Sequence, residues 1–433
     1  MGSFNWQDED ENWEISQNIL EAGVDQQVNG NLFQNVWLTR MIGLIAVGIV
    51  GIALFLWWWV DSVEQDLSAD VLESWQIVVA SDAADDIELF TNQLSGSNLD
   101  WIDSQKFMLE HDLLTSRAAI LPSLVLAKTE TALGEPAIEF SPDLIEAVLS
   151  HSVTYQDRWG RDIVLFQDEI FRLGSDRWLF SPPKASYWGE DEQGIVTRYS
   201  NRFAYSSPQR DIELTEKIIL WFEDRLDLIC LNDFNYACRE FDTPQIEIRF
   251  LPMITPNMLD GKFDQQLLSD LVFELPTPSL IGMPANDASE QLLIEAYGEI
   301  FFGDYLLSVI GAEYDIYGDR CLRAVVEYSA QQVGALSPVT VDDYAQYHAF
   351  ISKFNQDGSV IALNEEAQLE FSRLALKLIV PYRLQDTSIT PQVLVEERWP
   401  RGPQSFCAGL FFQGQNDWDN FNRFVEVRAA IQN

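Results

Sequence analysis

The chain has 433 residues, of which 68 are acidic and 27 basic, and its formal net charge is −41. Such a surface repels phosphate backbones, which excludes nucleic acid as a ligand and favours a cationic partner, or simply high solubility. The apolar fraction of 47% and the length allow roughly two or three packed domains.

An acidic tail over residues 1–35 precedes an apolar segment. Residues 41–60, MIGLIAVGIVGIALFLWWWV, contain no charged side chain. A helix of this length rises about 30 Å at ~1.5 Å per residue, which is the thickness of the hydrocarbon layer. We therefore predict a single transmembrane helix over residues 36–61 that binds the lipid bilayer through residues 41–60.

The flanks of this segment indicate its orientation. Trp57, Trp58 and Trp59 lie at one end and Trp37 near the other, where indole rings favour the membrane interface. Arg40 is the nearby cation on the N-terminal side, so the positive-inside rule places the N-terminus in the cytoplasm and the later domains outside. The acidic leader and the missing A-x-A site argue against a cleaved signal peptide.

Four cysteines, Cys230, Cys238, Cys321 and Cys407, all follow the apolar segment. An even number in an exported region predicts disulfides. The short spacing between Cys230 and Cys238 favours one bridge and leaves Cys321 with Cys407. The alternative is four buried free thiols in a cytosolic domain. No C-x-x-C occurs, which disfavours a zinc knuckle or a redox site.

Residues 62–187 change from helical to strand patterns. Apolar side chains recur at helical spacing over residues 62–128, and residues 151–183 read as strands, with DRWGRD and GSD as hairpin turns. The pattern predicts an α+β cone. Its closing stretch, FRL, a turn and RWLFSPP, resembles the last strands of NTF2-like domains, whose cones often bind a ligand at the mouth.

Residues 188–433 predict a second, mostly helical α+β domain. GIVTRYSNRFAYSS reads as a strand or hairpin, residues 209–229 as an amphipathic helix and QIEIRFLP as a strand. A Pro/Gly loop then precedes a long helix with Asn286, Asp287 and Ser289 as candidate N-caps. Further helices are predicted at about 319–334, 341–354, 364–379 and 415–430.

The loop and helix PTPSLIGMPANDASEQLLIEAYGEIF, in this order of elements, resembles peptidase-MA-like (gluzincin) domains of membrane-anchored bacterial proteins. That family carries H-E-x-x-H, in which two histidines on one helix face bind zinc beside a glutamate base. The histidine positions here hold Ile294 and Gly298, the base position Glu295, and Glu327 matches a later glutamate ligand. The resemblance implies a degenerate site, with Glu295 and Glu327 as its remaining candidates; the alternative is an ordinary core helix with one glutamate.

Other catalytic patterns are missing from the sequence. His111, His151 and His348 are scattered and have no ligand spacing, so we interpret them as structural. No nucleophile elbow, phosphate-binding loop or calcium loop occurs. We therefore expect no cofactor and no metal ion.

Three functions compete on these grounds. The first is a non-catalytic, membrane-anchored extracytoplasmic pseudoenzyme that acts in binding or assembly with a protein partner. The second is a metal-dependent, peptidase-like hydrolase with unconventional ligands, namely Glu295, Glu299 and Glu327 with a distant histidine. The third is a transmembrane signalling regulator whose tail binds a cytosolic partner.

Overall fold

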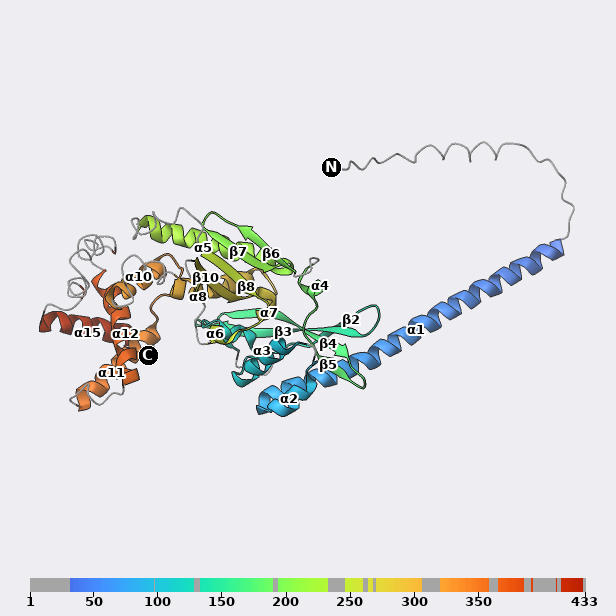
Figure 1. Ribbon diagram of the computed structural model, residues 1–433, viewed down its shortest axis with the longest axis horizontal. Coiled ribbons are helices and arrows are strands. Elements are labelled where there is room, and N and C mark those ends of the chain that lie inside the picture. The colour runs from blue at the N-terminus through green and yellow to red at the C-terminus, as the bar shows by residue number, and fades with distance from the viewer. Residues whose placement is uncertain are drawn as a thin grey trace, which may run out of the picture. The chain divides into compact units, whose positions relative to one another are not determined.

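A computed structural model of the chain describes part of its residues (Figure 1). The described residues are 32–96, 98–127, 133–189, 194–232, 246–259, 264–267, 270–305, 320–357, 365–384, 391, 410 and 414–430. Residues 1–31 of the acidic tail, Cys238 and Cys407 lie outside them. The chain divides into two compact units, residues 1–67 and residues 68–433, and the predicted α+β class is confirmed.

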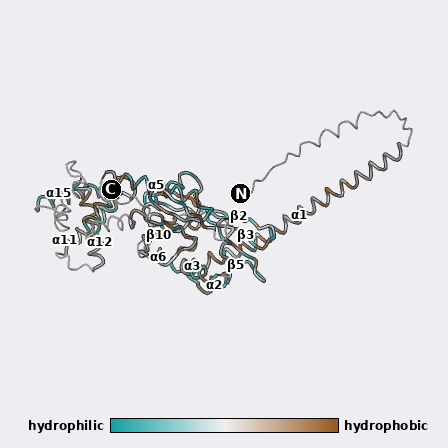
Figure 2. Tube along the Cα trace, turned by 45° about the horizontal axis from the view of Figure 1, so that its top comes forward, coloured by the Kyte–Doolittle hydropathy of each residue, from teal (hydrophilic) through white to brown (hydrophobic). Residues whose placement is uncertain are grey.

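Helix α1 (Leu32–Ala84) contains the apolar segment of residues 41–60. Its described side chains in this segment are exposed to solvent, and Figure 2 shows the hydrophobic residues along the helix. The large ones are Met41, Leu44, Ile45, Val47, Ile49, Val50, Ile52 and Trp58. In the described part of the chain, however, no helix is sufficiently long and apolar to cross a membrane. Side chains 37, 40, 57 and 59 of the predicted interface lie outside that part.

Two capped helices follow α1, as the helical pattern before the strands predicts. Helix α2 (Ile87–Gln93) begins after Asp86, whose carboxylate accepts the Leu89 N–H at 2.9 Å. Helix α3 (Leu99–Glu110) begins after Asn98, whose side chain accepts the Trp101 N–H at 3.1 Å. Each cap satisfies a backbone donor that the first turn leaves unpaired. A short turn, η1 (Arg117–Ile120), leads to the first sheet.

The first sheet has six strands in the order β1-β3-β4-β11, with β2 on β3 and β5 on β4. Buried and half-buried residues alternate along β3, so one face packs against the core. The turn between β3 and β4 confirms the predicted DRWGRD hairpin. The strands are β1 (Leu124–Leu126), β2 (Ala137–Phe140), β3 (Glu146–Asp157), β4 (Asp162–Leu173), β5 (Trp178–Phe180) and β11 (Met283–Pro284).

Strand β11 joins the two parts of the chain that the sequence divides at 187/188. Met283 pairs with Phe166 of β4, although more than a hundred residues separate them. The preceding Gly282 has φ +131°, and a Cβ there would lie 2.8 Å from Leu165 Cβ. Only glycine fits this turn, because other side chains would be strained and crowded. A strand from the predicted second domain thus extends the sheet of the first.

The second sheet has five strands in the order β6-β7-β8-β10-β9. β7, β8 and β10 run parallel, and β6 and β9 are antiparallel edges. The rings of Phe222 and Phe301 stack at 4.1 Å in the core beside this sheet. The strands are β6 (Ile195–Tyr199), β7 (Phe203–Pro208), β8 (Ile246–Leu251), β9 (Asp264–Leu267) and β10 (Asp270–Pro276).

Helices α5 and α8 pack against each other beside the second sheet. Helix α5 (Ile212–Asn232) connects β7 to β8 and begins three residues later than predicted, because residues 209–211 form the turn η2. Helix α8 (Asp287–Ile300) continues into a short π-helical turn, η4 (Phe301–Tyr305). Three short helices complete this region: α4 (Ala185–Trp188), α6 (Pro256–Leu259) and α7 (Pro278–Ile281).

Four further helices confirm the periodicity of the C-terminal part. They are α10 (Arg320–Gln332), α11 (Val341–Asp357), α12 (Glu365–Arg383) and α15 (Gln415–Ala429). Three of them, α11, α12 and α15, enclose an aromatic core in which Tyr347 stacks on Phe371 at 5.5 Å. Burial of these apolar faces, more than helix propensity, stabilises such helices.

Candidate functional site

Helix α8 carries the residues to which the peptidase resemblance points. Asn286 caps it by accepting the Ser289 N–H at 2.9 Å, which selects one of the three predicted caps. Leu293 and Tyr297 are fully buried. Glu295 and Glu299 lie four residues apart and therefore on one side of the helix, where both line a pocket.

The two histidine positions of the peptidase pattern are packed with apolar groups. Ile294 is 5% exposed. At Gly298, an added Cβ would lie 2.2 Å from Cζ3 of Trp221, which projects from α5. No imidazole fits at position 298 unless this indole moves, because real Cβ atoms do not approach carbon atoms so closely.

Glu295 and Glu327 lie on different helices, and each has its own cationic partner. Glu295 lies 3.2 Å from Arg161 and accepts from Gln291 at 3.1 Å. Glu327 accepts from Arg323 at 2.9 Å within α10. The described residues include no group of three histidine, cysteine, aspartate or glutamate side chains that could hold a metal ion.

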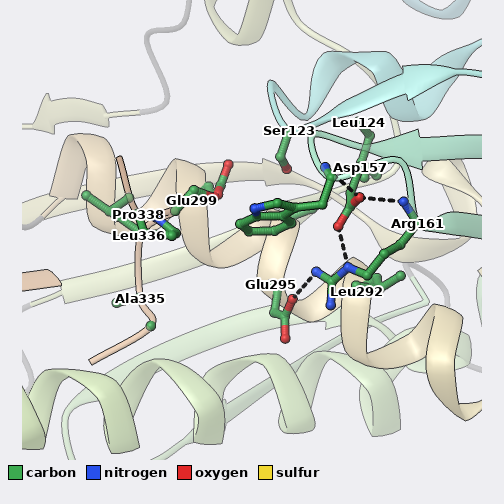
Figure 3. A pocket seen from close by; sticks show the side chains of 14 residues that line it. Ser123, Leu124, Asp157, Arg161, Leu292, Glu295, Glu299, Ala335, Leu336 and Pro338 are labelled. Carbon is green, nitrogen blue, oxygen red and sulfur yellow. Dashed lines mark hydrogen bonds and ion pairs between the residues drawn. The ribbon is translucent and has the colours of Figure 1, made fainter. Parts of the chain in front are cut away.

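The pocket beside Glu295, here called the hairpin pocket, has a volume of about 390 Å³. Its walls come from the β3–β4 turn, helix α8, the chain before β1 and the segment after α10 (Figure 3). Most of its lining is apolar. The lining residues are Ser123, Leu124, Asp157, Trp159, Arg161, Leu292, Glu295, Ala296, Glu299, Gly334, Ala335, Leu336, Ser337 and Pro338.

Asp157 and Arg161 fix the hairpin that forms one wall. The Asp157 carboxylate accepts the backbone N–H groups of Trp159 and Arg161 at 2.9 and 2.8 Å, and the Arg161 Nε at 2.6 Å. The Arg161 guanidinium lies 4.8 Å from the Trp159 ring centroid. Burial opposes its charge, but bonding to Asp157 and the charges of Asp157 and Glu295 raise the Arg161 pKa. The turn is therefore tied to α8 through a charged network.

Glu299 forms the deeper acidic wall of the hairpin pocket. Its carboxylate pairs with Arg158 and accepts from the Ser337 hydroxyl. Burial raises the pKa of Glu299, and the charge and hydrogen bonds of Arg158 oppose that effect without cancelling it. Asp157, Glu295 and Glu299 outnumber Arg161 and the Arg158 that pairs with Glu299, so one negative charge remains among these residues. The pocket suits an apolar group that ends in a positive charge.

A buried ionic cluster at the first sheet was not predicted from the sequence. Arg117 Nη2 lies 2.6 Å from both carboxylate oxygens of Glu169, and His151 Nε2 lies 3.6 Å from one of them. Burial opposes the Glu169 charge, but Arg117 and His151 outweigh it and lower the Glu169 pKa. Strand alternation shows which residues point inward, but not which of them meet across the sheet and the turn η1.

The described lining of the hairpin pocket includes no histidine and no cysteine. His151 is buried, with its ring centroid 5.2 Å from that of Trp75, and His111 bonds through Nδ1 to the Phe107 carbonyl at 2.9 Å. His348 is exposed on α11. Cys230 and Cys321, the described cysteines, are buried and neither is a free thiol.

Comparison of the chain with protein-family models, with curated proteins and with solved structures finds no match.

Proposed function

We propose that the chain is a non-catalytic, membrane-anchored protein that presents a binding pocket outside the cell membrane. The observation that carries this proposal is the Trp221 indole against Gly298, because it takes the space that a zinc-binding histidine would need. Ile294, at the other histidine position, is buried. Helix α8 then acts as a scaffold that holds Glu295 and Glu299 in the wall of the hairpin pocket.

The anchor in this proposal is the uncharged segment 41–60. Its described side chains are exposed, and exposed apolar rows of this length favour a lipid environment over water. Arg40 before the segment supports a cytoplasmic N-terminus. Disulfides that join Cys230 to Cys238 and Cys321 to Cys407 agree with an oxidising exterior.

The order of elements supports the two domain likenesses as part of this proposal. Helices α2 and α3 followed by an antiparallel sheet agree with an NTF2-like domain. Parallel strands β7, β8 and β10, the antiparallel edge β9 and then α8 agree with a degenerate peptidase-MA-like domain. Fold likeness suggests ancestry, whereas the side chains of a site determine its chemistry.

The hairpin pocket is suited to a protein partner that inserts an apolar residue beside a lysine or arginine. Leu124, Leu292 and Leu336 supply apolar contacts, and Glu295 and Glu299 supply the negative end. The excess of acidic residues over the whole chain would speed the approach of a basic partner at low salt.

Metal analysis of the full chain, purified in non-ionic detergent without chelator, tests the non-catalytic part. We expect far less than one zinc ion per chain and no peptide hydrolysis. About one zinc per chain, together with hydrolysis that Glu295→Gln abolishes, would establish the peptidase-like alternative instead.

Site-specific cross-linking tests the binding part. A photo-reactive residue at position 159 is expected to capture a basic protein in native membranes. The yield should fall in Glu295→Gln and at high salt, but not in Glu216→Gln, which removes an exposed charge on α5. Equal yields in all variants would show that the hairpin pocket does not select its partner by charge.

A further inference from the structure

An arginine-lined pocket lies on helices α10 and α12, which pack against each other. It has a volume of about 220 Å³, and we call it the arginine pocket. Arg320 and Arg323 are three residues apart on α10, so they project to the same side. Its lining residues are Arg320, Arg323, Ala324, Glu327, Arg373 and Leu376.

Among the described lining residues of this pocket, positive charge is in excess, against the trend of the chain. Glu327 is the one carboxylate among the described lining residues, and Arg323 already binds it at 2.9 Å. Arg320 and Arg373 make no hydrogen bond or ion pair with the described residues of the chain. By contrast, Arg172, Arg202 and Arg383 each pair with a carboxylate.

A neighbouring pocket of about 460 Å³ leaves Arg373 equally uncompensated. Arg373, Arg323 and Glu327 line this pocket as well, and the other charged lining residues are Arg158, Lys377, Glu299 and Asp343. Arg158 pairs there with Glu299, and Lys377 lies 2.8 Å from Asp343. Each of these cations thus has its own carboxylate, whereas Arg373 faces both pockets without one.

Because Arg323 is paired with Glu327, Arg320 and Arg373 are the cations of this pocket that an additional anion would compensate. Guanidinium groups bind oxyanions through paired, charge-assisted hydrogen bonds, which makes arginine suited to phosphate and carboxylate groups. Among the described lining residues, two positive charges remain after Glu327 is taken into account. This matches an oxyanion of charge about −2, such as a phosphate group.

We propose that the arginine pocket is a binding site for a small multivalent oxyanion, either a phosphate group or a compact polycarboxylate. The ligand is small because the net charge of −41 repels large polyanions such as nucleic acid. This site is separate from the hairpin pocket and does not depend on the function proposed for it.

Isothermal titration calorimetry on the full chain in non-ionic detergent tests the proposal, with sodium phosphate, sodium citrate and sodium chloride as probes at constant ionic strength. We expect saturable binding of phosphate, citrate or both, and none of chloride. Preference between the first two tells whether the natural ligand carries phosphate or carboxylate groups. Absence of saturable binding of both would overturn the proposal.

Matched variants show where the anion binds. Arg373→Gln should weaken binding about tenfold, the effect of losing one charge-assisted contact. Arg373→Lys should recover part of the affinity, because it restores the charge without the bidentate geometry. Arg198→Gln removes another exposed arginine, on β6, and should leave the affinity unchanged. Equal loss in Arg198→Gln and Arg373→Gln, or loss in neither, would also overturn the proposal.

Discussion

The indole of Trp221 lies where a side chain at position 298 would begin, 2.2 Å from an ideal Cβ. This contact couples α5 to α8 and requires glycine at position 298. Gly303, in the turn that follows α8, has no atom within 4 Å of its own ideal Cβ. The two glycines therefore form a matched pair with different surroundings.

Gly298→Ala is expected to destabilise the chain relative to Gly303→Ala by about 1–3 kcal/mol, the usual cost of overpacking. Alanine favours a helix over glycine by up to about 1 kcal/mol at either position, so the difference isolates the clash. Urea denaturation of both variants measures it. Equal free energies of unfolding would mean that Trp221 moves aside freely.

Arg117→Met should destabilise the fold by about 3–5 kcal/mol, because it leaves the buried Glu169 carboxylate without its cation. Arg198→Gln, which breaks an exposed pair with Glu216, should change the free energy of unfolding by less than about 1 kcal/mol. Chemical denaturation compares them. The double variant Arg117→Met/Glu169→Met should regain part of the loss, and a double variant as unstable as Arg117→Met would contradict this account.

The lowered pKa of Glu169 predicts loss of stability in acid. The unfolded chain takes up this proton near pH 4.3 and the folded chain at a lower pH. The contribution of Glu169 is therefore present above about pH 4.3 and is lost as the pH falls towards the folded pKa. Denaturation at pH values from 6 downward, as far as the chain stays folded, should show a shallower dependence of stability on pH for Glu169→Gln than for the unchanged chain. Parallel slopes would refute the assignment.

The raised pKa of Glu299 predicts that a cationic partner binds the hairpin pocket more tightly as pH rises through the folded value. Below that pH the carboxyl group is neutral, and the pocket loses one negative charge. The cross-linking yield at position 159 should therefore rise with pH, with its midpoint above the ordinary pKa of glutamate. Glu299→Gln should remove this rise. Persistence of the rise in that variant would assign it to another group.

The proposed disulfides predict matched effects within each pair. Cys230→Ser and Cys238→Ser should each lower the free energy of unfolding by about 2–4 kcal/mol, and the double variant by no more than either single change. Peptide mapping without reductant should find the two cysteines linked. Additive losses, or a free thiol at either position, would contradict the pairing.

Local patterns in the sequence were sufficient for many elements of this fold. The helical spacing over residues 341–354, the DRWGRD turn and the Asn286 cap each depend on neighbours within a few residues, and the structure contains all three. The likenesses to NTF2-like and peptidase-MA-like domains, by contrast, stay predictions, since they concern ancestry and function rather than local geometry.

Only the tertiary structure decided which distant residues meet. Glu295 was a candidate from its place on a helix, but its partner Arg161 is 134 residues away. The contact of Trp221 with Gly298 likewise depends on how α5 and α8 pack. Periodicity tells which face of a helix or strand is buried, whereas the pairing of two faces depends on chain crossing and register, which no local pattern contains. The sequence alone therefore determined many of the elements and the net charge, and packing determined the pockets.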